Sequence, residues 1–517
     1  MFIHKPSQTV VFNAVDPLAL RDLMPRFTRT INAPEGNIAV RYNPDTARVL
    51  KNLGYDTPSP TDLFYDWPGK YTPFDHQRIM VDTITRHPKV FNLSEMGTGK
   101  TYASLWAADY LMKIGAVHKV LILAPLSTVE RVWLQDIFDI LMHRTAKMAN
   151  GTEKVLDMLK LDLDFYIVNH DGIALTEVAK AIRKRTDIDL VIVDEASIFR
   201  NHKSRKYKFL KWVLERKDRL CLITGTPTPN APTDAWPLVR LVNPAAVPPY
   251  LGQFKRETMY QVTNFKWVPR TGSDKIVYKA MRPAVRFRKA DCLDLPPVIT
   301  VPMQSQVTKQ QRIAFDAMQN EMVLQTAKTE ISAVNAADQI NKLRQILCGA
   351  MRDPNTGEYI VLDHAPRLAN LCTAIDNAAA KVLVIVPFKG IIRVLEQELS
   401  GRYPLAVLNG DVTPRMRNEI IRNFKTTPTP HLLLCHPKVM AHGLNLVEAD
   451  TTIFYAPIYS NDEYRQVVER NNRAGQTRNM TIVRLAAHPL EWEIYRMVDN
   501  KDITQDNILS LYRQVTQ

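Results

Sequence analysis

The sequence is poor in glycine and cysteine and has no long apolar run. Glycine supplies 18 of the 517 residues, about half of what an average usage of roughly 7% would give. The five cysteines are scattered without a Cys-x-x-Cys pair, which argues against a disulfide framework and a structural zinc site. No stretch reaches the roughly 18 apolar residues of a membrane span, and Met1–Val15 lacks the pattern of a secretory signal. We therefore expect a cytoplasmic protein that does not cross a membrane.

The rest of the composition is that of an ordinary folded protein with excess positive charge. Hydrophobic residues make up 45% and charged residues 23%, which excludes a largely disordered chain. The length predicts about three compact units. Lysine and arginine total 67 against 53 acidic residues, a formal charge of +14. This excess favours a polyanionic partner without identifying one.

Two regions alternate short apolar runs with longer helix-like stretches. The first region has runs at residues 90–93, 119–124, 165–168, 190–193 and 220–223, and the second at 381–386, 405–408, 431–435, 452–455 and 481–485. Short continuous runs separated by helices indicate buried strands of a parallel sheet that is covered on both faces. The predicted fold class is therefore α/β, with two lobes.

These regions lead to a prediction of domain organisation. Residues 244–297 are rich in proline, aromatics and basic residues and show neither a strand pattern nor a helix pattern. Residues 308–347 have a helical pattern. The predicted parts are an N-terminal accessory region (1–65), a first lobe (66–245), a connector with a helical insertion (246–365), a second lobe (366–500) and a C-terminal tail (501–517).

A candidate phosphate-binding loop lies between the first strand and a helix. It reads Ser94–Thr101, and the residues expected to surround the phosphates are Met96, Gly97, Thr98 and Gly99. Backbone N–H groups of such a loop and the following helix N-terminus bind phosphate oxygens. Lys100 would reach the β- and γ-phosphates, and the Thr101 hydroxyl would bind Mg²⁺. Ser94 stands where the full pattern has its first glycine, and an ordinary glycine-rich turn is the alternative.

Two further strands end in polar residues at the edge where ligands of open α/β sheets bind. The strand at 190–193 ends in Asp194 and Glu195, which are placed to hold Mg²⁺ and to orient or deprotonate the attacking water. A solvated strand end is the alternative reading of such a pair. The strand at 220–223 runs into Thr224 and Thr226, whose hydroxyls could sense the γ-phosphate or simply cap a loop.

The second lobe contains two arginines three residues apart, Arg470 and Arg473. The spacing predicts that both lie on one helical face. An arginine that reaches the nucleotide of another lobe stabilises charge in phosphoryl transfer. Two arginines on a helix are also a common solubilising surface feature.

In this order the motifs resemble the superfamily-two helicase-like ATPases of the Swi/Snf-related branch, and they look most like the compact bacteriophage members. The likeness runs from about Tyr71 to Leu485. Besides the motifs above, it rests on Phe74–Gln77, Ala124–Ser127 with Trp133, Phe199–Asn201, Arg286–Lys289, Leu295–Pro297, His442–Leu446 and Arg470–Gln476.

The resemblance implies two RecA-like lobes that use ATP and Mg²⁺ and bind a nucleic-acid strand across both lobes. By this likeness, the ATP-site residues would be Gln77, Lys100, Thr101, Asp194, Glu195, Arg470 and Arg473, while Gly443 and Asn445 would couple the nucleotide to the strand. Ser94 and Ser197 depart from the family pattern, which has an acidic residue and a histidine at these positions.

Basic clusters and aromatics are candidate nucleic-acid contacts. The basic residues are Arg200, His202, Lys203, Arg205, Lys206, Lys208 and Lys211, followed by Lys279, Arg282, Arg286, Arg288 and Lys289 in the connector. They would neutralise phosphates without reading sequence, although a solvated basic helix face is the alternative. The aromatics are Tyr250, Phe254, Tyr260, Phe265, Trp267 and Tyr278. They could stack on bases or wedge a duplex junction, and a small core is the expected use for most of them.

The predicted function is an ATP-dependent DNA helicase or double-stranded DNA translocase, in phage replication, recombination or repair. An RNA helicase and a nucleotide-gated DNA-binding subunit of a larger assembly are the alternatives. Because one chain would supply both halves of the site, we expect a monomer, with replication or recombination proteins as candidate partners.

Overall fold

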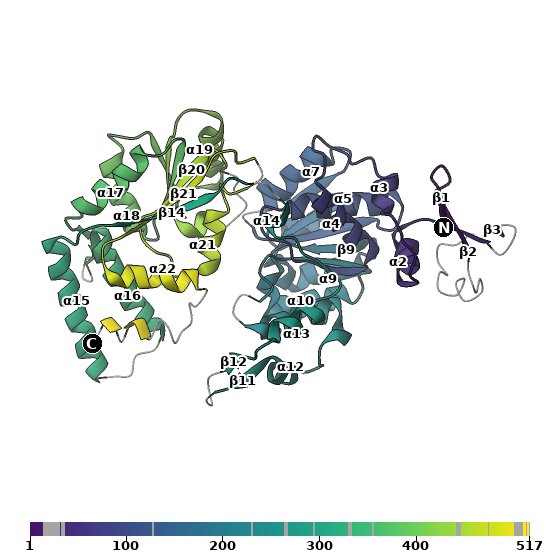
Figure 1. Ribbon diagram of the computed structural model, residues 1–517, viewed down its shortest axis with the longest axis horizontal. Coiled ribbons are helices and arrows are strands. Elements are labelled where there is room, and N and C mark those ends of the chain that lie inside the picture. The colour runs from purple at the N-terminus through teal and green to yellow at the C-terminus, as the bar shows by residue number, and fades with distance from the viewer. Residues whose placement is uncertain are drawn as a thin grey trace. The chain divides into compact units, whose positions relative to one another are not determined.

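The chain divides into two compact units, Met1–Leu293 and Asp294–Gln517, each drawn with its elements labelled in Figure 1. The computed structural model describes residues 1–13, 31–32, 37–126, 129–228, 231–262, 267–292, 295–328, 333–353, 356–440, 446–473, 475–500, 510–512 and 514–515. Each unit is built around one large parallel sheet, which confirms the predicted α/β class with two parallel-sheet lobes.

The main sheet of the first unit has seven parallel strands in the order β13-β5-β10-β9-β6-β8-β7. The strands are β5 (Lys89–Asn92), β6 (Lys119–Ala124), β7 (Ala146–Ala149), β8 (Phe165–Asn169), β9 (Ile188–Val193), β10 (Arg219–Ile223) and β13 (Ala284–Val285). Every residue of β8, β9 and β10 is buried, as expected for strands covered on both faces. All five predicted runs are strands, and they form the centre of the sheet.

Helices cover both faces of this sheet. In Figure 1, α4, α5 and α7 lie on one face, and α9 and α10 on the other. Two separate apolar clusters, one for each face, hold the helices to the strands. The helices are α4 (Asp75–Arg86), α5 (Lys100–Lys113), α7 (Gln135–Ile140), α8 (Thr152–Met158), α9 (Thr176–Lys184), α10 (Arg205–Leu214) and α11 (Ala235–Val242).

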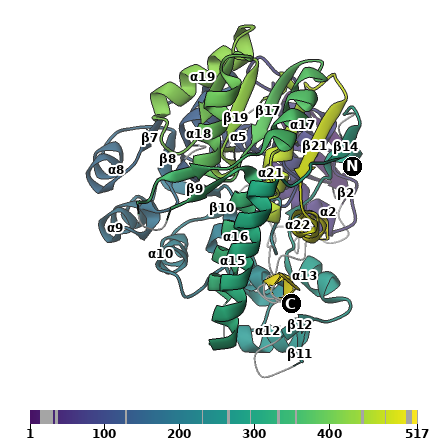
Figure 2. The same ribbon diagram turned by 90° about the vertical axis from the view of Figure 1, so that its left-hand side faces the viewer.

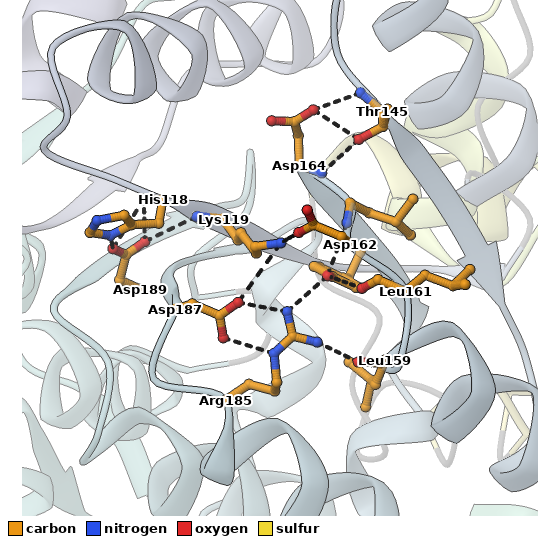
Figure 3. Close-up of polar contacts among 12 residues, drawn as sticks. His118, Lys119, Thr145, Leu159, Leu161, Asp162, Asp164, Arg185, Asp187 and Asp189 are labelled. Carbon is orange, nitrogen blue, oxygen red and sulfur yellow. Dashed lines mark hydrogen bonds and ion pairs between the residues drawn. The ribbon is translucent and has the colours of Figure 1, made fainter.

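Charged residues hold together the strand ends opposite the candidate loop (Figure 3). Lys119, at the start of β6, pairs with Asp162 and lies 3.8 Å from Asp187, which also pairs with Arg185 at 2.7 Å. The Asp189 carboxylate accepts hydrogen bonds from the backbone N–H and ring of His118. Because each carboxylate in this group has a cationic or N–H partner, we assign the cluster to the alignment of β6, β8 and β9 rather than to a site.

The N-terminal region forms a small sheet with two helices. Its antiparallel strands, in the order β1-β2-β4-β3, are β1 (Phe2–His4), β2 (Thr9–Asn13), β3 (Ile31–Asn32) and β4 (Asn37–Arg41). Helices α2 (Pro44–Asn52) and α3 (Pro60–Phe64) follow. Arg86 of α4 donates hydrogen bonds to the carbonyls of Thr57 and Pro58, and Arg48 of α2 donates to the Arg86 carbonyl. These bonds join α2 and the segment that follows it to α4.

The sheet of the second unit has six parallel strands in the order β14-β21-β20-β17-β19-β18. They are β14 (Val298–Gln304), β17 (Lys381–Ile385), β18 (Leu405–Leu408), β19 (Leu432–Cys435), β20 (Ala449–Phe454) and β21 (Met480–Ala486). The covering helices are α17 (Ala365–Asp376), α18 (Lys389–Leu399), α19 (Pro414–Thr426), α20 (Pro437–Met440), α21 (Asn461–Val468) and α22 (Pro489–Asp499). All five predicted runs of this region are again strands.

A helical pair and the end of the chain share a further core in this unit. Helices α15 (Lys309–Lys328) and α16 (Ala333–Cys348) lie side by side (Figure 1) and confirm the helical pattern of residues 308–347. A short hairpin, β15 (Ala350–Arg352) and β16 (Tyr359–Val361), follows α16. Leu511, Tyr512 and Val515 are buried in the same apolar cluster as α15, α16 and α22. This part of the C-terminal region is therefore packed against the second unit.

A fully buried ion pair connects five parts of the second unit. The Arg367 guanidinium makes two hydrogen bonds to the Glu491 carboxylate, at 2.6 and 3.1 Å, and both side chains are at most 1% exposed. Arg367 also donates to the carbonyls of Leu347, Tyr455 and Leu485. All the N–H donors of the Arg367 guanidinium are therefore used, which is the condition under which a buried charge is tolerated.

We expect Arg367→Ala to lower the free energy of unfolding of the second unit by about 3–5 kcal/mol, because it leaves the Glu491 carboxylate buried without a cation. Hydrogen exchange of the β20 and β21 amides measures this change. Arg402→Ala is the control, since it breaks an exposed pair with Asp376 and should cost less than about 1 kcal/mol. Equal effects of the two substitutions would contradict the assignment.

Candidate functional site

The candidate phosphate loop connects β5 to α5 as predicted. Gly97 and Gly99 both have left-handed backbone conformations, with φ of 81° and 77°. Glycine adopts these angles without strain, and successive N–H groups in such a turn form a concave anion-binding nest. Lys100 is the first residue of α5, so the positive end of the helix dipole lies at the same place. Left-handed glycines followed by a helix N-terminus are features of phosphate-binding loops.

Gln77 of α4 lies directly against this loop. A Cβ atom on Gly99 would come within 1.9 Å of the Gln77 side-chain nitrogen, so the Gln77 amide touches the loop backbone. The Gln77 Oε1 atom accepts a hydrogen bond of 2.9 Å from the Phe74 backbone N–H. Gln77 is buried. The structure therefore brings together Gln77 and the loop, two elements that the sequence analysis placed in one site.

Lys100 and a buried histidine hold the two ends of the loop. The Lys100 ammonium donates a hydrogen bond of 2.7 Å to the Ser94 carbonyl. The His76 Nε2 atom lies 3.0 Å from the Thr98 carbonyl, and because a carbonyl only accepts, this nitrogen carries the hydrogen. Burial lowers the pKa of His76, which favours the neutral ring. His76 lies inside the Phe74–Gln77 motif, yet the sequence analysis gave it no role.

The connector after the insertion runs alongside the loop. The Leu93 and Glu95 N–H groups donate to the carbonyls of Val285 and Phe287, at 2.8 and 2.9 Å. The Ser94 hydroxyl accepts from the Phe287 N–H at 3.1 Å. Ser94, which departs from the family pattern, therefore links the loop to the connector.

The carboxylate pair lies at the end of β9, as predicted. One Asp194 oxygen accepts from the Trp133 indole N–H at 3.1 Å, and the other accepts from the Glu195 backbone N–H at 3.0 Å. A carboxylate oxygen accepts about two hydrogen bonds, so each oxygen retains one lone pair that could coordinate Mg²⁺. Glu195 itself has a left-handed backbone, with φ 47° and ψ 49°, a conformation that costs a non-glycine residue about 1–2 kcal/mol.

A second histidine secures this strained turn. The His170 Nε2 atom donates to the Asp194 carbonyl at 2.7 Å, and burial lowers the pKa of the ring. The Asp194 N–H donates to the Leu123 carbonyl of β6 at 2.8 Å. The backbone of Asp194 is therefore held on both sides, which maintains the unusual Glu195 conformation. Strain stored in this way is common at functional sites.

The turn after β10 completes the loop region. A Cβ atom on Gly225 would lie 3.5 Å from the Lys100 ammonium nitrogen, so this turn contacts the loop. The Thr224 hydroxyl is buried and accepts from the Thr226 N–H at 3.2 Å. This is the geometry of a side-chain-capped turn, one of the two readings left open for these threonines. Arg200 and Lys203, which follow the carboxylate pair, are exposed.

The prediction that Arg470 and Arg473 share a helical face is wrong. Helix α21 ends at Val468, and both arginines lie in the turn that follows. The backbone there bonds to the rest of the unit: the Leu446 N–H donates to the Arg470 carbonyl at 2.9 Å, and the Asn471 side chain donates to strand β20 at 3.0 Å. These tertiary bonds compete with a further helical turn.

The two arginines also differ in exposure. Arg470 is only 3% exposed. Arg473 is half-buried, and its Nε atom donates to the Glu469 carbonyl at 2.9 Å. Gly443 and Asn445, the predicted coupling residues, lie outside the described residues.

Comparison with known families decides the assignment. The model of the SNF2-related domain matches residues 93–356, more than half of the 517 residues. The chain belongs to the SNF2-related family. The model of the helicase conserved C-terminal domain matches residues 366–475. Both predicted lobes therefore carry helicase-type sequences, and the predicted class of enzyme, a helicase-type ATP hydrolase, is confirmed at the level of the family.

Individual relatives are distant. An uncharacterized ATP-dependent helicase of Mycoplasma genitalium is 24% identical over 76% of this chain, and the match spans 37% of the relative's length. Putative protein p41 of Acyrthosiphon pisum secondary endosymbiont phage 1 is 22% identical, over 86% of this chain and 99% of p41. This SNF2-related chain thus spans about a third of the length of the Mycoplasma relative and nearly all of the phage protein.

Among solved structures, the SWI2/SNF2 ATPase core of Sulfolobus solfataricus in complex with dsDNA matches with a TM-score of 0.40 at 18% identity. The match covers 87% of this chain and 97% of the archaeal one.

In the part of the SNF2-related chain that the structure describes, no helix is both long and apolar enough to span a bilayer.

Proposed function

We propose that the protein is an ATP-driven motor that moves along DNA. The observation that carries the proposal is the conformation of the loop between β5 and α5. The loop has two left-handed glycines and is followed by Lys100, whose ammonium group lies close to the turn after β10. In this proposal the loop and Lys100 bind the phosphates, and Gln77 contacts the adenine side. Glu195 orients or deprotonates the attacking water.

Magnesium fits the donors that are present. Thr101 and Asp194 would hold the ion, which neutralises phosphate charge in phosphoryl transfer. The spare lone pairs on the two Asp194 oxygens support this role. Arg470 and Arg473 of the second unit act on the same nucleotide during the cycle, which makes one chain sufficient for turnover. Gly443 and Asn445 would couple the nucleotide to the strand.

The proposed track is duplex or forked DNA, bound through its phosphates. Residues 200–211, which follow Glu195, carry six lysines or arginines and no acidic residue. Such a segment binds a phosphate backbone without reading base sequence. The motifs are those of the SNF2-related branch, whose members typically track duplex DNA, and this favours DNA over RNA. The match along p41 supports a phage role, in replication, recombination or repair in the host cytoplasm.

We expect duplex DNA to raise the rate of ATP hydrolysis at least about tenfold, and Glu195→Gln to lower the stimulated rate by about 10²–10⁴, the range for a general base. Phosphate release with DNA, with RNA and without nucleic acid measures the rate, and electrophoretic mobility shift measures DNA binding, which should survive the substitution.

Glu177→Gln on the exposed side of α9 is the matched control, and it should leave both readouts unchanged. An unchanged low rate with every nucleic acid would instead indicate a nucleotide-gated binding subunit. Stimulation by RNA alone would indicate an RNA helicase.

A further inference from the structure

The insertion between α11 and β13 is a built substructure whose role none of the ATP-site residues explains. It comprises α12 (Leu251–Thr258), the antiparallel strands β11 (Met259–Gln261) and β12 (Trp267–Pro269), and α13 (Ser273–Ala280). We call residues 250–262 and 267–282 the hairpin insertion. Figures 1 and 2 both show its strands at the lower end of the first unit, beyond α13 and away from α5.

One side of the hairpin insertion is fixed to the first unit. Phe254, Val277, Ala280 and Met281 belong to the apolar cluster that covers one face of the main sheet, and Phe254 is 1% exposed. The Asn243 side chain donates to the Arg282 carbonyl at 3.1 Å and joins the two ends of the insertion. A ligand held on the outer side would therefore be held in a fixed relation to the main sheet.

Trp236 of α11 links this insertion to the basic segment after Glu195. Its indole N–H donates to the Pro248 carbonyl at 2.8 Å, two residues before Tyr250. Its ring packs edge-on against His202, with centroids 5.4 Å apart. The basic segment 200–211 and the start of the insertion are thus neighbours, and a strand bound at the first can continue to the second.

The insertion exposes three aromatic side chains. Tyr250 is 76% exposed, Tyr278 53% and Tyr260 45%. In the hairpin, Met259 is buried and Tyr260 pairs with Val268. Because successive side chains of a strand alternate, Tyr260 lies on the face opposite to Met259. A small core, the use expected for most of the aromatics, accounts for Phe254 but not for these three tyrosines. Phe265 lies outside the described residues.

The charge around these rings selects the kind of partner. Residues 250–282 contain seven lysines or arginines against two acidic residues. Arg256, Arg270, Lys275 and Lys279 are exposed. Protein interfaces are depleted of lysine at their centres, whereas basic side chains interleaved with exposed aromatics are typical of surfaces that bind single strands. Paired bases inside a duplex offer no free face for stacking, so the rings favour unpaired nucleotides.

We propose that the hairpin insertion binds an unpaired DNA strand at the edge of a duplex, with bases stacked on Tyr260 and Tyr250 and phosphates on the surrounding basic side chains. The proposal rests on the proposed function, since it assumes that DNA is the track. It adds a preference for DNA ends or forks with an unpaired strand, which the motor residues do not provide.

Fluorescence anisotropy at fixed salt tests this with three probes: a blunt duplex, and the same duplex with a 5′ or a 3′ single-stranded extension. Wild-type protein should bind one of the extended probes more tightly than the blunt one. Tyr260→Ala should weaken binding to that probe about 5- to 100-fold, the effect of losing one stacked base, and Tyr250→Ala should act in the same direction. Tyr260→Phe should bind like wild type, because it keeps the ring.

Phe138→Ala on α7 is the matched control, since Phe138 is 61% exposed and lies outside the insertion. The Phe138→Ala protein should bind each probe with the same affinity as wild type. The Tyr260→Ala protein should keep its affinity for the blunt duplex and its ATPase stimulation by that duplex. The proposal is overturned if wild-type protein binds all three probes with equal affinity. It is also overturned if Tyr260→Ala weakens binding to blunt and extended DNA by the same factor. Unchanged binding of every probe by both tyrosine variants also overturns it and indicates a protein partner for the insertion. Failure of any DNA to stimulate the wild-type ATPase would instead refute the proposed motor.

Discussion

Lys100→Ala is expected to abolish ATP turnover, with or without DNA. The Lys100 ammonium lies at the start of α5, bonded to the Ser94 carbonyl at 2.7 Å and next to the turn at Gly225. In the proposed function it is the cation of the loop that neutralises the β- and γ-phosphates. Its removal takes away a fixed positive charge where negative charge accumulates in the reaction, and no other residue of the loop is basic.

The same helix offers a matched control for this experiment. Lys113 lies in the last turn of α5 and pairs with the exposed carboxylate of Asp66. Lys113→Ala makes the same charge change in the same helix, yet it should leave phosphate release within about twofold of wild type, since exposed pairs contribute little. Thermal unfolding of both variants shows whether the fold is kept. A folded Lys100→Ala protein with wild-type turnover would refute the role assigned to the loop.

The central strands of both sheets could be predicted because their sequences are unambiguous. Runs such as Leu190–Val193 are apolar at each position and buried on both faces, as strands of a covered parallel sheet are. The three edge strands that the sequence analysis missed are different. Ala146–Ala149 and Ala284–Val285 are short, and Val298–Gln304 is largely exposed and contains Pro302. Their strand conformation depends on pairing with a neighbour rather than on their own pattern.

The candidate site shows the same division between local and tertiary information. The loop, Asp194 and Glu195 were predictable because each follows directly after a recognisable strand. His76, His170 and Trp133 hold backbone or carboxylate atoms of the site from positions that are remote in sequence. A buried histidine or tryptophan has no local pattern that indicates its partner, so such contacts require the three-dimensional structure.

The arginine pair shows how a spacing argument can mislead. Three residues apart is a helical neighbour distance only if the helix continues, and α21 ends at Val468. The Asn471 side chain bonds to β20 instead, in agreement with the preference of asparagine for turns over helix interiors. The two arginines are therefore not equivalent, and they can be separated by experiment.

Arg473→Ala is expected to lower the rate of ATP hydrolysis by about 10³–10⁵, the range for an arginine finger. Arg473 is half-buried, with its Nε atom on the Glu469 carbonyl. This contact fixes the base of the guanidinium. Since a finger acts mainly in the transition state, the affinity for a fluorescent ATP analogue should change little. Arg470 is 3% exposed, so Arg470→Ala should also reduce the thermal stability of the second unit.

Arg478→Ala is the control for the charge change, because Arg478 is exposed and lies five residues beyond Arg473. Its turnover should stay within about twofold of wild type, as expected for an isolated surface charge. A loss of ATP affinity by the same factor as the rate would assign Arg473 to binding rather than to the transition state. A rate within tenfold of wild type for the folded Arg473→Ala protein would show that hydrolysis does not use this arginine, and would leave Arg470 as the remaining candidate in the second unit.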